Sequence, residues 1–312
     1  MRGHFLTLAD LKGADVRELL RTAASLKRRP AAGRRRLSGK VVALVFQKPS
    51  LRTRVSFEVA ARQLGGSAIY LGPDDSQLNL REPVKDVART LSRYVDALVV
   101  RTFRHEDVEE CARYASIPVI NGLSDLHHPC QALADLFTLQ ERFGRLNGLT
   151  LAYIGDGNNV LHSLIQGAAM FGIRLRVATP DGYAPQATVW NQATRGGEGT
   201  LELMLGKPGA AVRGADVIYT DVWTSMGQER QRQARVKAFR GFQVTRKLLE
   251  QAARGCVVLH CLPAHRGEEI TDEVLESSRS LVFQQAENRL HVQKALLWWL
   301  LGTPSGRRVS HG

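Results

Sequence analysis

The sequence predicts an α/β protein with two domains, each a mostly parallel sheet flanked by helices, joined by bridging helices. Its 312 residues, of which 44% are hydrophobic, suffice for two hydrophobic cores. Short apolar runs alternate with segments of helical length along nearly the whole chain. Strands separated by helices of about 10–15 residues form parallel sheets through right-handed crossovers.

The first half of the chain contains one series of such strands and helices. The expected strands are 41–46, 68–71, 97–101 and 118–120, and the expected helices are 53–64, 84–94 and 106–115. Residues 41–46 form a continuous apolar run, which is typical of a strand buried on both faces. Gly65 and Gly66 directly follow the first of these helices and end it.

The second half contains another series, which begins after a helix over 131–143 that is expected to bridge the two sheets. Strands are expected at 149–154, 175–178, 217–220 and 257–259, and helices at 160–171 and 287–301. The segment Thr-Pro-Ser-Gly-Arg at 303–307 is typical of a frayed tail. The expected domains are therefore 1–130, completed by a C-terminal helix at about 288–312, and 131–287.

Composition excludes several classes of protein. Four cysteines in a chain of this length do not make a disulfide scaffold, and they fit a reducing compartment. No stretch approaches the roughly 18 apolar residues of a membrane helix. The first residues lack an apolar signal core and carry acidic groups early. We therefore expect a cytoplasmic location and no membrane partner.

The chain is strongly basic, with 43 Lys and Arg against 30 Asp and Glu and a net charge of +13. This balance favours an anionic partner, whether nucleic acid, a membrane surface or a phosphorylated metabolite. The only dense basic run lies at 27–36, where a solvated connection between a helix and a strand is the favoured explanation. No aromatic residue interleaves with the run, so it offers no platform for stacking bases. Charge alone does not decide the function.

In open α/β sheets, ligands bind beyond the carboxyl ends of the strands. The first strand leads into residues 47–58, where Ser50 is a natural N-cap for the following helix. Arg52 and Arg54 both fall in the first turn, where their charges oppose the helix dipole. Free amides, two hydroxyls and a guanidinium at a helix N-terminus favour a bound phosphate over an ordinary capped helix.

Other polar groups follow later strands. Arg101 ends the third strand, and His128-Pro129 precedes Gln131 at the start of the bridging helix. Either feature alone is more often structural than functional. Asp221 opens a loop through Gly227 that could cover a cleft.

Three further patterns predict little by themselves. The turn Gly155-x-Gly157 lacks the third glycine of a dinucleotide site, and Lys207 lacks the hydroxyl and upstream glycine of a P-loop. The spacing of Cys256, His260, Cys261 and His265 resembles that of zinc ligands. However, strand alternation sends Cys256 and Cys261 to opposite sides, so a convergent site is not expected. We expect Cys261 to present a thiol to the crevice, and we expect neither a metal nor a cofactor.

Together these motifs resemble the aspartate/ornithine carbamoyltransferase family, from Phe5 to the final helix. The resemblance lies in Ser50-x-Arg-Thr-Arg and His128-Pro-x-Gln, which are similar to the family's carbamoyl phosphate signatures, and in Asp221-x-Trp-x-Ser-Met-Gly and His260-Cys-Leu-Pro, which are similar to the ornithine branch. Four motifs in the right order make the resemblance specific. It implies a carbamoyl phosphate domain, an ornithine domain, and a homotrimer with shared active sites.

The resemblance also implies roles for individual residues. Carbamoyl phosphate would be bound by Ser50, Leu51, Arg52, Thr53, Gln77, Arg101, His128, Gln131, Cys261, Leu262 and Arg289, with Gln77 reaching into a neighbouring subunit's site. L-Ornithine would be bound by Asn159, Asp221, Ser225 and Met226. Arg101, His128 and Cys261 would be catalytic. At position 51 this chain has leucine where many members of the family have threonine. Leucine retains the main-chain amide contact but lacks the threonine hydroxyl.

The implied reaction is transfer of the carbamoyl group to the δ-amine of ornithine, which gives citrulline and phosphate in arginine metabolism. Two alternatives within the family are another amine acceptor, such as putrescine or a modified ornithine, and aspartate. Asp221 and Ser225 argue against putrescine, which has no α-amino or α-carboxylate group. A third alternative is a basic nucleic-acid-binding protein with an inactive crevice. We expect no specific nucleic acid partner.

Overall fold

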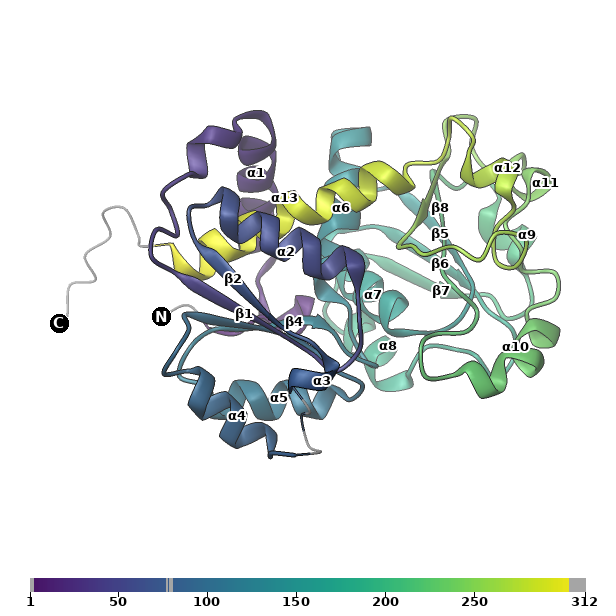
Figure 1. Ribbon diagram of the computed structural model, residues 1–312. Helices are drawn as coiled ribbons and strands as arrows, with labels where there is room; N and C mark the ends of the chain where they lie inside the picture. Colours follow the sequence, from purple (N-terminus) through teal and green to yellow (C-terminus); the bar gives the residue numbers. More distant parts are fainter. Residues whose placement is uncertain (1–2, 77, 79–80, 303–312) are drawn as a thin grey trace. The chain divides into compact units, whose positions relative to one another are not determined.

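A computed structural model describes residues 3–76, 78 and 81–302, and its contacts divide the chain into two compact units (Figure 1). Unit 1 comprises the residues up to 6, those of 14–124 and those from 290 onward. Unit 2 comprises Thr7–Gly13 and Asp125–Arg289. The short segment Thr7–Gly13 belongs to unit 2. After Ser124 the chain passes from unit 1 into unit 2, before the expected domain boundary at 130.

Unit 1 contains a four-stranded sheet in the order β2-β1-β3-β4, in which every pairing is parallel. Its strands are β1 (Val41–Phe46), β2 (Ser67–Leu71), β3 (Ala97–Arg101) and β4 (Val119–Leu123). The last residue of β1 pairs with Arg101 at the end of β3. The carboxyl ends of these two strands therefore lie at one edge of the sheet.

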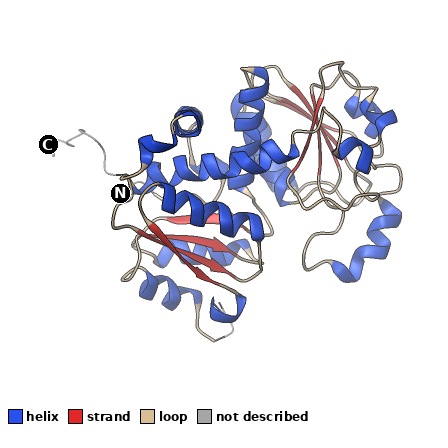
Figure 2. Cartoon of the chain, turned by 45° about the horizontal axis from the view of Figure 1, so that its top comes forward, coloured by secondary structure: helices blue, strands red, loops and turns tan. Residues whose placement is uncertain are grey.

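Helices cover both faces of this sheet (Figures 1 and 2). They are α1 (Gly13–Arg28), η2 (Pro30–Gly33), α2 (Leu51–Gln63), α3 (Pro73–Ser76), α4 (Val84–Leu91) and α5 (His105–Tyr114). Helices α4 and α5 lie on one face, and α1 and α2 lie on the other. A cluster of buried side chains from α4, α5 and the sheet, including Val45, Ala88 and Val108, forms the core on the first face.

Unit 2 contains a five-stranded parallel sheet in the order β7-β6-β5-β8-β9. Its strands are β5 (Thr150–Ile154), β6 (Arg174–Ala178), β7 (Thr200–Leu203), β8 (Val217–Thr220) and β9 (Val257–His260). Ile154 pairs with Thr220, and Thr220 pairs with His260. The segments that follow β5, β8 and β9 therefore begin side by side.

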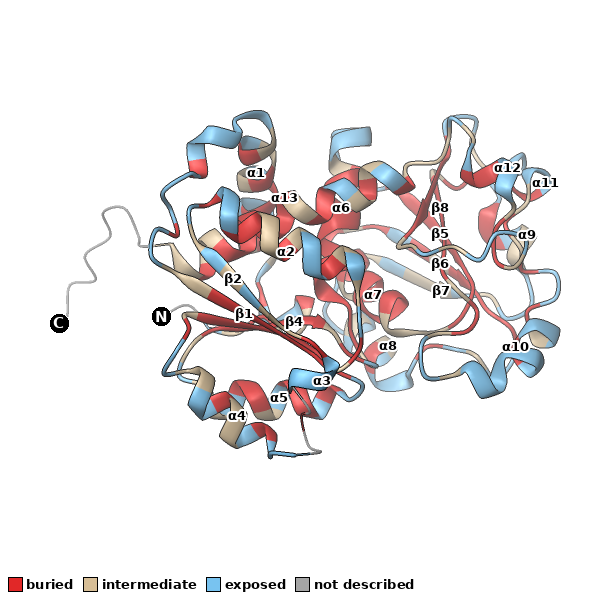
Figure 3. Ribbon diagram, in the orientation of Figure 1, coloured by how far each residue is buried: buried red, intermediate tan, exposed pale blue. Residues whose placement is uncertain are grey.

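The helices of unit 2 also lie on both faces of its sheet (Figure 2). They are η1 (Leu8–Asp10), α6 (Pro129–Phe143), α7 (Asn159–Phe171), α8 (Ala187–Thr194), α9 (Pro208–Val212), η3 (Glu229–Gln231), α10 (Arg232–Ala238), α11 (Arg246–Leu249) and α12 (Asp272–Leu275). The last helix, α13 (Val282–Leu301), belongs to unit 2 up to Arg289 and to unit 1 beyond it. The inner strands of both sheets are mostly buried, whereas the edge strands β2 and β7 contain no buried residue and α10 is mostly exposed (Figure 3).

The predicted fold class is confirmed: each unit is a parallel sheet flanked by helices. The final helix begins at Val282 and not at 287, because Val282 and Gln285 are buried and extend its buried face toward the N-terminus. Strand β7 was not expected, since it is a short edge strand whose residues alternate between polar and apolar. The predicted tail at 303–307 lies outside the described residues.

Within the described part of the chain, every helix is too short or too polar to cross a membrane.

Candidate active-site residues in the two units

The start of α2 has the geometry expected of a phosphate-binding helix terminus. Ser50 is extended, with φ of −159°, and its Oγ accepts a hydrogen bond from the Thr53 amide at 3.3 Å. The Ser50 hydroxyl also donates to Thr53 Oγ1 at 3.0 Å. The predicted N-cap is therefore confirmed. The Leu51 side chain is 76% exposed and leaves this end of the helix open.

The two arginines in the first turn of α2 differ in their surroundings. Arg54 Nε donates to Glu58 Oε1 at 2.9 Å, and its guanidinium lies 3.9 Å from the Tyr70 ring centroid. Arg52 makes no ion pair or hydrogen bond with any other described residue. The contacts of Arg54 therefore give it a structural role. The half-buried Arg52 makes no such contact with the described residues, so its guanidinium can bind an anionic ligand.

Two basic residues are buried at the carboxyl edge of the first sheet. Arg101 ends β3 and is buried, as is Lys48, which follows β1. The Lys48 ammonium lies 4.8 Å from the Phe103 ring centroid, a cation–π contact. Lys48 was not among the site residues predicted from the sequence. The available signal was a lysine in the connection between a buried strand and the Ser50 cap.

In unit 2, Gln131 and Arg289 lie together although they are far apart in the sequence. Arg289 Nη1 donates to Gln131 Oε1 at 3.1 Å, and both side chains are buried. His128 is the N-cap residue of α6, and its amide donates to Ser163 Oγ at 2.8 Å. The start of α6 thus presents a histidine and a glutamine, the pair predicted from the His-Pro-x-Gln motif.

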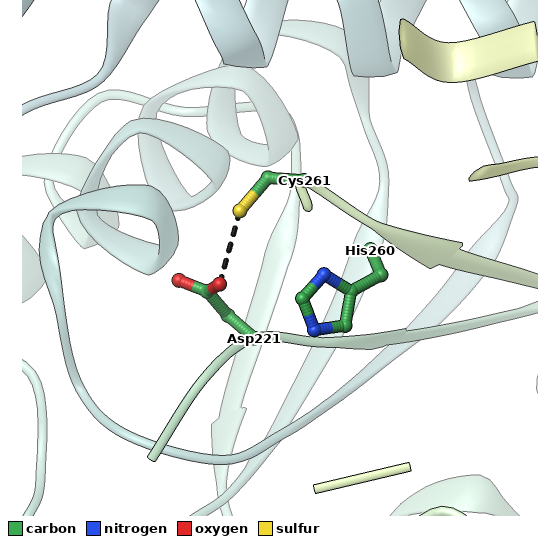
Figure 4. Close-up of side chains that lie close together, drawn as sticks. All are labelled: Asp221, His260 and Cys261. Atoms are coloured by element: carbon green, nitrogen blue, oxygen red, sulfur yellow. Dashed lines mark hydrogen bonds between the residues drawn. The ribbon is translucent and has the colours of Figure 1, made fainter. Parts of the chain in front are cut away.

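Asp221 and Cys261 meet where β8 and β9 end (Figure 4). The Cys261 thiol donates to Asp221 Oδ1 at 3.0 Å. Asp221 Oδ2 accepts from Asn158 Nδ2 at 2.6 Å. Asn158 also caps α7, because its Oδ1 accepts from the amides of Val160 and Leu161. The residue predicted from the sequence was Asn159, the first of α7, whereas the contact with Asp221 is made by Asn158.

Cys261 is a neutral thiol in this setting. Burial raises the pKa of Cys261 well above 9, and the carboxylate of Asp221 raises it further, while Arg289 opposes both effects. A neutral thiol can donate a hydrogen bond, as the contact with Asp221 requires.

His260 lies beside this pair, and its side chain is used by the fold. Its Nδ1 accepts from the Leu262 amide at 2.9 Å, so Nε2 carries the proton and donates to Glu269 Oε1 at 3.0 Å. Ligand atoms of Asp221, His260 and Cys261 come within 4.8 Å of one another. Because both ring nitrogens of His260 are engaged, this cluster lacks the third ligand that a metal would need. The hydrogen bond from Leu262 also fixes the backbone directly after Cys261.

The loop after β8 is anchored at its base and exposed at its tip. The buried Trp223 stacks on Phe239, and its carbonyl accepts from Arg235 Nη1 at 2.9 Å. Arg235 also pairs with Asp156 at 2.9 Å. Ser225 is half-buried and Met226 is 50% exposed, and neither contacts Asp221 or Cys261 through a described hydrogen bond. Arg235 was not predicted, since nothing in its local sequence marks it as buried.

The Gly-x-Gly turn after β5 has a packing explanation. A side chain at Gly157 would collide with the backbone of Ala184 and Pro185. Glycine is therefore required here by the close approach of two chain segments, whether or not a nucleotide binds. Gln77, which was expected to complete a neighbouring site, lies outside the described residues.

Comparisons with known proteins point to one family. The model of the aspartate/ornithine carbamoyltransferase carbamoyl-P binding domain matches residues 3–141, and that of the Asp/Orn binding domain matches 147–300. A curated ornithine carbamoyltransferase of Gloeobacter violaceus is 53% identical over 303 residues, which are 96% of each chain. One of Acidothermus cellulolyticus is 53% identical and covers 98% of this chain and 99% of its own.

Solved structures agree with these similarities. The ornithine carbamoyltransferase of Pyrococcus furiosus has a TM-score of 0.92 at 50% identity, and the match covers 96% of this chain and 97% of that one. The enzyme of Thermus thermophilus has a TM-score of 0.88 at 47% identity, with 96% and 99% covered.

Proposed function

The chain belongs to the aspartate/ornithine carbamoyltransferase family, and from this we propose that it transfers the carbamoyl group of carbamoyl phosphate to L-ornithine. The δ-nitrogen attacks the carbamoyl carbon, the bond from that carbon to the phosphate oxygen breaks, and the nitrogen loses a proton. The products are L-citrulline and phosphate, as in arginine metabolism. The observation that carries the acceptor assignment is the hydrogen-bonded set of Cys261, Asp221 and Asn158.

The donor half of the proposal rests on the start of α2. Ser50, Thr53, the Leu51 amide and the guanidinium of Arg52 hold the phosphate, whose charge suits a helix N-terminus. A neighbouring subunit supplies Gln77 to the same phosphate.

The carbamoyl group is held by polar side chains that suit its developing charge. Attack on the carbonyl gives a tetrahedral oxyanion, so donors must face the carbonyl oxygen. Arg101 and His128 provide such donors, and Gln131 contacts the carbamoyl amide. Arg289 holds Gln131 in place through a hydrogen bond and also places its positive charge beside the substrate.

The acceptor half binds ornithine at both ends. Asn159, Asp221, Ser225 and Met226 hold the α-amino and α-carboxylate groups, and Cys261 and the Leu262 carbonyl lie beside the δ-amine. The δ-amine must be neutral to attack, although the pKa of a free amine is about 10.4. A site whose thiol is itself neutral and desolvated disfavours an ammonium ion and so favours the reactive form.

The homotrimer implied by the family is also part of the proposal. Leu51 and Val55 are exposed one turn apart on α2, and Ile69 is exposed on the edge strand β2. Exposed apolar side chains of this kind suit an interface with another subunit. The cytoplasmic location expected from the sequence stays a prediction.

Product formation from carbamoyl phosphate with a panel of acceptors tests the reaction. The panel is ornithine, acetylornithine, putrescine, lysine and aspartate. We expect citrulline from ornithine and no more than trace product from the others. A preference for another amine would overturn the acceptor half alone. If folded protein neither reacts with any acceptor nor binds carbamoyl phosphate, the whole proposal is wrong.

A further inference from the structure

Asp135 lies at the centre of a buried network of amide groups in unit 2. It is on α6, one turn after Gln131, and it is fully buried. Its Oδ1 accepts from Gln131 Nε2 at 2.8 Å and from Gln285 Nε2 at 2.7 Å. One carboxylate oxygen thus receives two side-chain amides, one from α6 and one from α13.

This arrangement fixes the direction in which each amide points. A glutamine side chain donates through Nε2 and accepts through Oε1. Because Oδ1 of Asp135 accepts, both Nε2 atoms must face it, and both Oε1 atoms must face away. The Oε1 of Gln131 then meets Arg289, and the Oε1 of Gln285 accepts from the His260 amide at 2.9 Å. A flip of either amide would place like groups together.

The two arms of the network end at different parts of the site. The first arm ends at Gln131 and Arg289, two of the residues assigned to bind carbamoyl phosphate. The second arm ends at the backbone of His260, directly before Cys261. Tyr219 Oη, which accepts from Gln285 Nε2 at 3.1 Å, holds the second arm from β8.

We propose that Asp135 is a positioning residue, which orients Gln131 for the carbamoyl group and fixes the backbone from which Cys261 projects. The inference rests on the proposed function, because it takes Gln131 and Cys261 to be substrate contacts. Asp135 itself touches no substrate in this assignment.

The chemistry of Asp135 fits this role. Burial raises the pKa of Asp135 to about 7, while hydrogen bonds from Gln131, Gln285 and Tyr219 and the charge of Arg289 lower it. A carboxyl group keeps an acceptor oxygen in either protonation state. An asparagine at this position also offers one oxygen to both glutamines, whereas an alanine offers none.

Steady-state kinetics of three variants test the proposal. We expect Asp135→Ala to raise KM for carbamoyl phosphate and lower kcat, each by about tenfold, because two buried donors lose their acceptor. Asp135→Asn should stay within about threefold of the wild type in both, because it keeps the acceptor. Thr138→Val is the matched control: Thr138 is buried on the same helix and accepts from Asn288 on α13 at 2.9 Å, but it lies outside the network. It should lower thermal stability and leave both constants unchanged.

A second readout does not depend on turnover. Alkylation of Cys261 by iodoacetamide, followed by mass spectrometry, should be at least about fivefold faster in Asp135→Ala than in the wild type or Asp135→Asn, since its backbone anchor is loosened. If Asp135→Ala does not fold, Gln285→Met, which keeps the volume and removes the amide, should show the same faster alkylation.

The outcomes separate this inference from the proposed function. Wild-type protein that makes no citrulline overturns the proposed function. An active wild type with unchanged constants and alkylation in Asp135→Ala overturns the positioning role alone. Asp135→Asn as impaired as Asp135→Ala also overturns it, because the negative charge and not the acceptor geometry would then matter.

Discussion

The Cys261 thiol donates to Oδ1 of Asp221 at 3.0 Å, while Oδ2 of the same carboxylate accepts from Asn158 at 2.6 Å. The carboxylate is thereby oriented by two donors from two different strand ends. Because Asn158 also caps α7, the start of that helix and the acceptor site share one side chain. A change at Asn158 therefore has two separable consequences.

Asn158→Ser and Asn158→Ala separate the cap from the contact with Asp221. Serine is a good N-cap but is too short to replace the amide that donates to Asp221. We expect Asn158→Ser to raise KM for ornithine about tenfold with little loss of stability, and Asn158→Ala to do the same and lose about 1 kcal/mol. Kinetics and urea unfolding measure the two effects. Equal stability loss in both variants would contradict the capping role.

The raised pKa of Cys261 predicts slow alkylation. At pH 8 the thiol is almost entirely protonated, so the rate with iodoacetamide should rise about tenfold per pH unit through pH 9 without a plateau. Asp221→Asn should speed the reaction at pH 8, because it removes a nearby negative charge that raises the pKa. A rate that levels off below pH 9 would show that the thiol is not so perturbed.

Arg52 and Arg54 form a matched pair for testing the phosphate site. They lie two residues apart at the start of α2, but among the described residues only Arg54 has a partner. Arg52→Ala should weaken carbamoyl phosphate binding by at least about tenfold, since a charge-assisted hydrogen bond is lost. Arg54→Ala should change it by less than about threefold. Calorimetric titration with carbamoyl phosphate measures both, and similar effects would mean that the first turn acts only through net charge.

The buried pair of Arg235 and Asp156 is expected to hold the loop that carries Ser225 and Met226. Burial raises the pKa of Asp156 to about 6, and Arg235 opposes that rise. Arg235→Met leaves a buried carboxylate without its cation, so stability at pH 8 should fall by about 3 kcal/mol. Adding Asp156→Asn should restore part of the loss. If the double variant is less stable than Arg235→Met, the charge is not the cause.

Asp135 makes the stability of the protein depend on pH. Its pKa is about 7 in the fold against 3.8 as the ordinary value, so the folded state holds a proton that the unfolded state releases between these values. Its contribution to stability is complete below pH 3.8 and is lost as pH rises to 7, at up to about 1.4 kcal/mol per pH unit. Asp135→Asn lacks this dependence, so its free energy of unfolding should rise relative to that of the wild type between pH 5 and 7. Thr138→Val should keep the wild-type slope in urea unfolding.

Most of the fold could be predicted because many of its strands contain short apolar runs. Such runs between helices of ordinary length admit a parallel sheet and little else, and strand ends direct attention to Ser50, Arg101, Asp221 and Cys261. The edge strand β7 escaped notice because its exposed residues carry no such signal.

The sequence by itself determined the two α/β sheets, the capped start of α2 and the order of the motifs, because these depend on neighbours along the chain. Tertiary structure alone decided the partners of distant residues. It joined Asn158 to Asp221, Arg235 to Asp156, and Gln285 to Asp135. No local pattern encodes such pairs, since each depends on which buried polar groups the packing of strands and helices leaves without water.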